Sequence, residues 1–452
     1  MCHRDRSKID DKITVTKLVP LGLQHVLAMY AGAIIVPLLL GGALKLTSNE
    51  VSYLVSADLF TCGMATLLQT IGIGRFIGIR LPVVLGCSFT AVSPMIAIGS
   101  QMGIRAIYGA IIGSGALVFL SAPFLSRLTR FFPPVVIGSI MTVIGLSLTP
   151  VAMNHAAGGA GSAGFGSFEN LLLSGFVLLL IVLINRCFKG FLQAISVLLG
   201  IIVGSLVGAG MGIMHFGEVA KANWVNLVVP FSFGFPTFHL TGILTMWIVV
   251  TISMIESIGV FIGTGRLCNY SIEREDLVRG LRAEGLAQIL GGIFNAFPYT
   301  AFAQNTGLLA LTKVSSRYVV VAAGMILMIF GVLPKFAALT TIIPIPVLGG
   351  AMLAMFGMVA VSGIRILNTV DFNHSPNMLI AGCSLAVGLG IAAVPGVFDK
   401  MPELFRILFS SSIISGSIVA IVLNILMNWQ EVLKNKEWTT DQKLVEHNTN
   451  FF

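Results

Sequence analysis

The stretches L-P-V-V-L-G-C-S-F-T-A-V-S-P, residues 81–94, and A-F-A-Q-N-T-G-L-L-A-L-T-K, residues 301–313, decide the fold of this chain. Both lie in long apolar surroundings, and both contain hydrogen-bonding side chains. A proline stands six residues before Ser88 and another stands six residues before Gln304, so neither stretch suits an unbroken helix. Broken backbone at membrane depth is tolerated only where it is buried in protein or lines a cavity. The matched pair therefore indicates a binding site near the middle of a membrane, with packing kinks at helix crossings as the alternative.

The composition agrees with a membrane protein. Of 452 residues, 56% are hydrophobic and 10% are charged, whereas about 25% of the residues in soluble domains are charged. Apolar stretches of about 17–25 residues, enough to cross a hydrocarbon core of about 30 Å, recur between residues 18 and 429. The net charge of +8 does not indicate nucleic acid, because the basic residues are placed where they set the topology. Six scattered cysteines without a CxxC pattern predict neither a disulfide framework nor a metal site.

We predict an all-α membrane protein with fourteen transmembrane spans. The spans are at residues 18–44, 51–72, 81–100, 105–126, 132–150, 171–185, 190–214, 238–265, 277–296, 298–312, 317–340, 342–363, 376–394 and 404–428. Because this number is even, both tails lie on one side of the bilayer, and 21 of the 27 Lys and Arg residues lie there too. The six on the other side are Lys45, Arg105, Lys221, Lys335, Lys400 and Arg406. Since Lys and Arg accumulate in cytoplasmic loops, we expect a multi-pass protein of the plasma (inner) membrane with both termini in the cytoplasm.

Two similar segments indicate an internal repeat. P-P-V-V-I-G, residues 133–138, opens the fifth span, and P-I-P-V-L-G, residues 344–349, opens the twelfth. Seven spans separate them, and an odd number of spans per repeat inverts the second copy relative to the first, as in many secondary transporters. The predicted fold is therefore a 7+7 inverted repeat. In it, span 3 pairs with span 10, both of them broken, and span 1 pairs with span 8.

Three carboxylates are predicted within the spans, where each costs about 2.5–3.5 kcal/mol. Glu256 lies well inside span 8, in M-I-E-S-I-G, and is predicted to bind a ligand or a proton, with a helix-packing hydrogen bond as the alternative. Glu284 lies about two turns into span 9 and is predicted to support the site or its coupling, unless it pairs with Arg279 or Arg282. Asp58 in span 2 suits a helix-end contact near the outer surface as well as it suits a function.

Span 1 carries the neighbouring polar residues Gln24 and His25. A histidine can form hydrogen bonds or take up a proton near neutral pH. Because span 1 is the repeat counterpart of span 8, we predict that His25 acts together with Glu256, although a lone histidine is more often a packing residue.

The segment Q-N-T-G-L-L-A-L-T-K, residues 304–313, resembles a family signature. It matches the motif Q-N-x-G-x-x-x-x-T-[R/K] of the nucleobase–ascorbate transporter family, also called nucleobase:cation symporter family 2, at all five specified positions. Further landmarks of the family occur in the same order, namely Gln24-His25 in span 1, Ser88-Phe89-Thr90 in span 3 and Glu256 in span 8. The resemblance extends over roughly residues 17–430 and is closest to bacterial xanthine and uric acid permeases.

This resemblance implies a core domain, spans 1–4 and 8–11, that rocks against a gate domain, spans 5–7 and 12–14, usually in a homodimer. The predicted divisions are an N-terminal cytoplasmic tail at 1–17, core segments at 18–126 and 238–340, gate segments at 132–214 and 342–428, and a C-terminal cytoplasmic tail at 429–452. The bilayer is the expected surrounding, and nucleic acid is not an expected partner.

The resemblance also implies which residues hold a purine base. The implied contacts are made by the side chains of Glu256 and Gln304, by backbone groups at Phe89 and Ala303, and by the neighbouring Ser88 and Thr90. Supporting or coupling roles are implied for His25, Gln24, Asn305 and Glu284. Many members of the family have Asp at the position of Glu284. The chemistry agrees, because a purine dione presents N–H donors and carbonyl acceptors in one plane. A carboxylate accepts from two donors, whereas a carboxamide donates and accepts at once. The Phe89 ring adds a surface for stacking.

The substrate and coupling ion follow from a few positions. In the xanthine and urate branch of the family, Thr at position 90 favours uric acid, with xanthine second, because Thr is smaller than Asn and offers a hydroxyl. A proton is the expected coupling ion, since Glu256, Glu284 and His25 titrate and no separate sodium cage is evident; no other cofactor is expected. A xanthine-selective permease is the alternative. An anion transporter is disfavoured because no Lys or Arg lies deep in spans 3, 8 or 10. An enzyme is not expected, because the sequence lacks the residue patterns typical of hydrolases.

Overall fold

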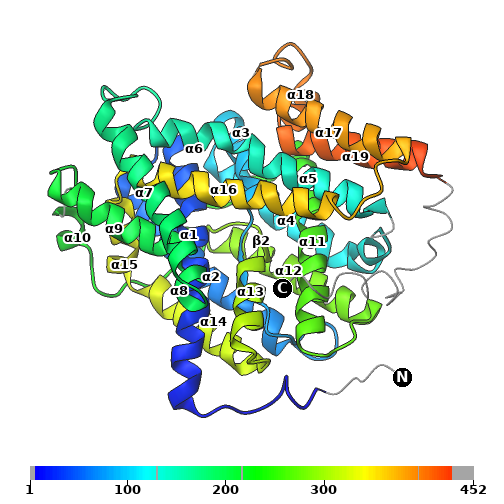
Figure 1. Ribbon diagram of the computed structural model, residues 1–452, viewed down its shortest axis with the longest axis horizontal. Coiled ribbons are helices and arrows are strands. Elements are labelled where there is room, and N and C mark those ends of the chain that lie inside the picture. Colours follow the sequence, from blue (N-terminus) through cyan, green and yellow to red (C-terminus); the bar gives the residue numbers. More distant parts are fainter. Residues whose placement is uncertain (1–5, 129–130, 215–216, 395, 430–452) are drawn as a thin grey trace.

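The computed structural model describes residues 6–128, 131–214, 217–394 and 396–429. The predicted C-terminal tail, residues 429–452, therefore lies outside the described residues except for residue 429. In chain order the elements are α1 Val15–Ala43, α2 Ser48–Ile71, β1 Leu85–Cys87, the 3-10 helix η1 Phe89–Ala91, α3 Val92–Met102, α4 Ile104–Leu128, α5 Pro134–Ser147, α6 Thr149–Ala156, α7 Phe168–Cys187, α8 Phe191–Ala194, α9 Ser196–Gly210, α10 Gly217–Lys221, α11 Leu240–Leu267, α12 Arg274–Ile293, β2 Tyr299–Ala301, α13 Ala303–Thr312, α14 Arg317–Val332, α15 Pro334–Thr341, α16 Ile345–Leu367, α17 Ser375–Ala393, α18 Glu403–Phe409 and α19 Ser412–Met427 (Figure 1).

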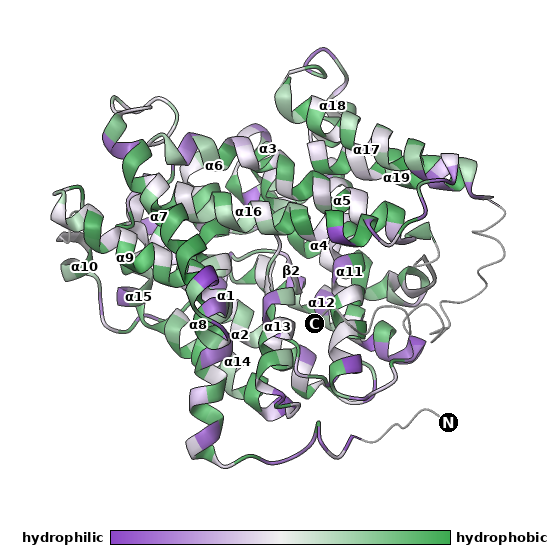
Figure 2. Ribbon diagram, viewed as in Figure 1, coloured by the Kyte–Doolittle hydropathy of each residue, from purple (hydrophilic) through white to green (hydrophobic). Residues whose placement is uncertain are grey.

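The protein is a mostly helical membrane protein. Eight helical segments of the described chain are long and apolar enough to cross a bilayer, and α14 with α15, bent by 76°, would make a ninth. The helices α9 and α19 are apolar but have only 15 and 16 residues. Outward-lying helices such as α7 and α17 are largely hydrophobic in Figure 2, and hydrophilic positions occur inside the molecule near β2, α12 and α13. Fourteen crossings in two inverted halves stay a prediction.

Each of the two proline-containing stretches forms a short strand followed by a helix. The strands β1 and β2 pair antiparallel, with Gly86 opposite Thr300, and the ribbon lies near the centre of the view in Figure 1. The pairing continues beyond the strands, because the Ser88 N–H donates to the Pro298 carbonyl at 2.9 Å. At Gly86 an added Cβ would lie 2.5 Å from the Phe302 ring, so only glycine permits this approach.

Side-chain hydroxyl groups complete the hydrogen bonding of this ribbon, as a membrane interior requires. On the β1 side, the Thr66 hydroxyl accepts from the Leu85 N–H at 3.1 Å and donates to the Leu85 carbonyl, while Thr70 donates to the Val83 carbonyl at 3.2 Å. Both threonines lie on α2. The ribbon is therefore fixed to α2 along one edge, and the other edge faces α11, as described below.

The long helices pack in pairs from distant parts of the sequence. Helix α4 packs on α12, α2 on α14, α5 on α16, and α17 on α19. Small residues allow the close approaches that stabilise helix pairs in lipid. At Gly285 of α12, for example, an added Cβ would lie 2.7 Å from the backbone nitrogen of Phe119 on α4.

Part of the N-terminal segment packs on the protein. Ile9 is fully buried, and its carbonyl accepts from the Arg317 N–H at 2.9 Å. Arg317 also pairs with Asp10, and the Ser316 hydroxyl donates to the Asp11 carbonyl at 2.6 Å. The segment therefore lies at the start of α14, and α1 begins at Val15, three residues before the predicted boundary.

Candidate functional site

Ser257 of α11 fixes the free edge of β2. Its buried hydroxyl accepts from the Ala301 N–H at 2.9 Å and lies 2.9 Å from the Thr300 hydroxyl. The Thr300 hydroxyl also reaches the backbone carbonyl of Ser253, one turn earlier on α11, at 3.3 Å. The strand that leads into α13 is thus attached to α11 by two consecutive residues.

Ser253 attaches the other interrupted segment to the same helix. Its hydroxyl lies 2.8 Å from the Ser88 hydroxyl and within hydrogen-bond distance of the Thr90 hydroxyl, and Ser88 and Thr90 also bond to each other. All three side chains are at most 2% exposed. The structure therefore places Ser88 and Thr90 in a closed hydroxyl cluster rather than on an exposed surface.

Glu256 lies on α11 between these two serines. Its side chain is half-buried, and among the described residues none forms a hydrogen bond or ion pair with its carboxylate. Gln304 and Ala303 are exposed on the first turn of α13. Helix α13 is tied to α11 at Ser257 through β2 and again where the Thr264 and Thr306 hydroxyls lie 3.1 Å apart.

These two ties locate Gln304 relative to Glu256. Residue 301 lies at the level of Ser257 and residue 306 at the level of Thr264, so the two helices run in the same direction. Gln304 lies between those levels, further along α11 than Glu256. The structure thus brings the predicted carboxylate and the predicted carboxamide into one region, and both remain accessible.

Phe89 adds an aromatic side chain from η1. Its ring is half-buried and lies edge-on to the Phe356 ring of α16, with the ring centroids 5.7 Å apart and an interplanar angle of 86°. Phe356 lies on the helix that opens with the second copy of the proline repeat. The residue predicted to stack on a base is therefore in contact with α16, which lies in the predicted gate segment at residues 342–428.

The predicted supporting residues His25 and Asn305 are brought together. Asn305 Nδ2 donates to the His25 carbonyl at 2.9 Å and lies 3.2 Å from His25 Nδ1. Both residues are buried, and Gln24 beside them is half-buried. This contact joins α1 to the start of α13, next to Gln304.

The other two carboxylates in the spans are both fully buried. Neither oxygen of Glu284 has a hydrogen-bond partner within the described part of the chain, and Ser257 and Glu256 are among the groups that interact with it electrostatically. The alternative that Glu284 pairs with Arg279 or Arg282 is wrong, because neither carboxylate oxygen has a partner among the described residues and Arg279 is hydrogen-bonded to Asp276.

The helix-end alternative for Asp58 is also wrong. Its carboxylate accepts from the Tyr299 hydroxyl at 3.3 Å, next to β2, and from the Cys62 thiol at 3.7 Å. Asp58 therefore helps to fix the strand from the α2 side.

Sequence reasoning missed Ser253 and Ser257. The available signal was their position, because each serine lies within one turn of Glu256 on α11. Ser88 and Phe302 are the residues that join strand to helix in the two segments.

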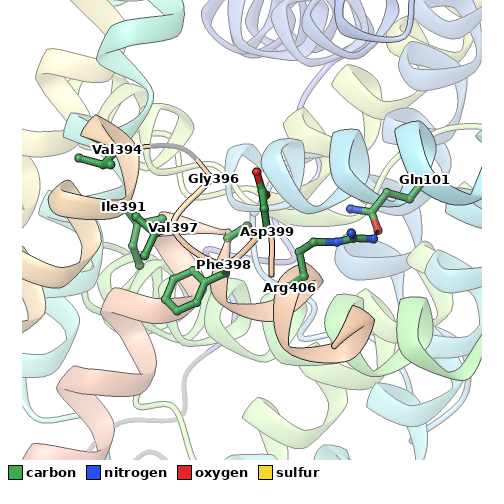
Figure 3. Close-up of a pocket in the computed structure, with 9 residues that line it drawn as sticks. Gln101, Ile391, Val394, Gly396, Val397, Phe398, Asp399 and Arg406 are labelled. Carbon is green, nitrogen blue, oxygen red and sulfur yellow. Dashed lines mark hydrogen bonds between the residues drawn. The ribbon is translucent and has the colours of Figure 1, made fainter. Parts of the chain in front are cut away.

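A cavity of about 410 Å³ lies away from this region, at the ends of α3, α17 and α18. In Figure 3 the Arg406 side chain extends toward Gln101, and Arg406 Nη2 donates to Gln101 Oε1 at 3.1 Å. The cavity is lined by Gln101, Ile391, Val394, Gly396, Val397, Phe398, Asp399, Arg406 and Ser410, and none of the predicted site residues is among them. In the part of the chain that the structure describes, no three His, Cys, Asp or Glu side chains are grouped to hold a metal ion.

Comparison with known proteins gives a consistent result. Residues 16–397 match a family described as a permease family. The chain is 54% identical over 411 residues to nucleobase transporter PlUacP of Paenibacillus larvae, covering 91% of this chain and 94% of that one. It is 53% identical to the xanthine permease of Bacillus subtilis, covering 94% and 97%, and 50% identical to uric acid permease PucJ of the same organism, covering 95% and 97%.

Solved structures share the fold at low identity. The transmembrane domain of the cyanobacterial bicarbonate transporter BicA aligns with a TM-score of 0.57 and 15% identity, over 92% of this chain and 100% of that domain. The murine anion transporter solute carrier 26 family member A9, in an inward-facing state, aligns with a TM-score of 0.61 and 14% identity, over 94% of this chain and 70% of that one.

Proposed function

Because the chain belongs to this permease family, whose signature is that of the nucleobase–ascorbate transporters, we propose that it takes up a purine base, uric acid first and xanthine second. Its named relatives are permeases and transporters, not enzymes. The observation that carries the proposal is that a partly exposed carboxylate, Glu256, and an exposed carboxamide, Gln304, lie on neighbouring helices that run in the same direction, next to the paired strands of the two interrupted segments.

In this proposal Glu256 and Gln304 bind complementary groups of the base. Glu256 accepts hydrogen bonds from ring N–H groups. Its carboxylate is free to do so because no described residue forms a hydrogen bond or ion pair with it. Gln304 donates to a carbonyl and accepts from a second N–H. Backbone N–H groups at Phe89 and Ala303, at the starts of η1 and α13, add donors that helix ends leave unpaired. The Phe89 ring stacks on the plane of the base.

Transport then proceeds by alternating access between two groups of helices. We assign residues 18–126 and 238–340 to the core and residues 132–214 and 342–428 to the gate, in a fourteen-span, 7+7 inverted arrangement. The packing supports this division, since α2, α4, α12 and α14 pack among themselves, as do α5, α16, α17 and α19. The contact between Phe89 of the proposed core and Phe356 of the proposed gate supports a site at the boundary between the two.

The exposed positions on α13 support a site that is open toward the side of the membrane predicted to carry 21 of the 27 Lys and Arg residues. Along α13 the exposed positions Ala303, Gln304, Gly307 and Leu311 follow one face toward Lys313. An added Cβ at Gly307 would have no neighbour within 4 Å, and the same holds for Gly259 on α11. At the opposite end the Arg406–Gln101 hydrogen bond joins gate helix α18 to core helix α3. We assign the basic side, with both termini, to the cytoplasm and propose a homodimer.

We assign coupling to a proton. The titratable groups in the region are Glu256, Glu284 and His25, and Glu284 is buried without a hydrogen-bond partner among the described residues. Uptake should collapse with a protonophore and persist when sodium is replaced by choline. Strict sodium dependence would reject this coupling.

Uptake of radiolabelled uric acid, xanthine, hypoxanthine and uracil into cells that lack their own purine permeases tests the function. We expect saturable uric acid uptake that xanthine inhibits. A xanthine-selective permease is the second candidate, because a relative of 53% identity is named a xanthine permease; it would take up xanthine in preference. Absence of uptake of all four bases at normal membrane levels would refute the proposal.

A further inference from the structure

The hydroxyl cluster around Ser253 connects the two neighbours of Phe89 to the helix that carries Glu256. Ser253 lies three residues before Glu256, and positions three apart on a helix share a face. Its hydroxyl bonds to Ser88 at 2.8 Å and also to Thr90, so it grips the chain on both sides of Phe89. No other residue of the described chain is recorded as bonding to the Ser88 and Thr90 hydroxyls.

The cluster leaves no hydroxyl proton for a ligand. Each of the three hydroxyls has one proton and can accept from its neighbours, and the three oxygens form three mutual contacts. When each proton occupies one contact, every donor in the cluster is used. The Thr90 hydroxyl is thus occupied by protein groups, and the side chain is only 1% exposed. A direct hydrogen bond from Thr90 to a purine would require the cluster to open.

We propose that Ser253 is a positioning residue for substrate choice, through which Thr90 acts on the placement of Phe89 rather than by touching the base. The inference rests on the proposed purine transport and refines its site. By holding Ser88 and Thr90, Ser253 fixes the spacing between the Phe89 ring and the Glu256 carboxylate. That spacing decides how much room remains for the C8 carbonyl that distinguishes uric acid from xanthine.

The test is a double-mutant cycle on the ratio of the xanthine KM to the uric acid KM. The variants are Thr90→Val, Ser253→Ala and both together, because valine keeps the shape of threonine without its hydroxyl. Each single change should shift the ratio by roughly 2- to 13-fold, as expected for one lost hydrogen bond. The double change should shift it no further than the larger single change, since both act through one cluster.

Thr142→Val in α5 is the matched control. Thr142 is also buried, and its hydroxyl donates to the Gly138 carbonyl of its own helix at 2.7 Å. This change should lower stability without moving the ratio. If Ser253→Ala fails to reach the membrane, Ser253→Cys, which keeps a weak donor, takes its place in the cycle.

The outcomes separate this inference from the function on which it rests. Wild-type protein that takes up no purine would refute the proposed function and the inference together. Normal wild-type uptake with ratios unchanged in the single variants would refute the inference alone. The same holds for two shifts that multiply in the double variant, because Thr90 would then act independently of Ser253.

Discussion

Replacing Ser257 with alanine should weaken purine binding, because this hydroxyl fixes β2 to α11. The substitution removes the acceptor of the Ala301 N–H, a backbone group on a residue that is 1% exposed. Thr300 loses one partner at 2.9 Å but keeps the Ser253 carbonyl at 3.3 Å. The larger effect is therefore the unpaired Ala301 N–H, which costs about 1–3 kcal/mol when buried.

That free energy should be measurable in substrate affinity. Strand β2 can recover a partner for the Ala301 N–H only by moving away from α11, and α13 begins two residues later, at Ala303. The movement shifts Gln304 relative to Glu256, and binding the base must then restore the original geometry. An energy of about 1–3 kcal/mol corresponds to a KM for uric acid that is roughly 5- to 150-fold higher.

The assay is initial-rate uptake of radiolabelled uric acid, with membrane levels measured for each variant. Ser139→Ala is the matched control: Ser139 is equally buried, but its hydroxyl donates only to the Val135 carbonyl within α5 at 2.7 Å. A wild-type KM in Ser257→Ala would refute the reasoning, even if the variant were less thermostable. So would an equal rise in KM for Ser139→Ala.

Three further predictions concern the same machinery. Glu256→Gln should raise the uric acid KM roughly 10- to 150-fold by replacing a charged acceptor with a neutral amide, and saturable uptake with unchanged KM would remove Glu256 from the site. Asn305→Ala breaks the contact with His25 and should lower the maximal uptake rate more than it raises KM. Binding is measured by titrating the purified protein with uric acid, and the rate is measured by uptake. Weaker binding with an unchanged maximal rate would contradict a supporting role for Asn305. Gln101→Glu should convert the contact with Arg406 into an ion pair and slow maximal uptake roughly 1.5- to 5-fold, with recovery in the Gln101→Glu/Arg406→Gln double variant; an unchanged rate in Gln101→Glu would mean that this contact does not limit opening.

The sequence alone was enough to identify a helical membrane protein, its family and the positions where regular helix would break. These features depend on composition and local rules: apolar stretches of bilayer length, prolines that cannot donate a backbone hydrogen bond, and a five-position motif from Gln304 to Lys313. The break at residues 81–94 was predictable because Pro82 and Pro94 bracket the stretch and disfavour an unbroken helix. Glu256 could be singled out because a carboxylate inside an apolar helix needs a reason.

Only the tertiary structure decided which of the singled-out residues meet, since contacts between distant segments depend on helix packing and strand register. It placed Asp58 against Tyr299 instead of a helix end, and it gave Arg279 to Asp276 instead of Glu284. It also assigned Ser253 and Ser257 to the two interrupted segments, 165 and 44 residues away from their partners Ser88 and Ala301. The sequence around a helical serine does not indicate which distant residue its hydroxyl will bond to. That partner depends on how β1 and β2 pair and how they lie against α11.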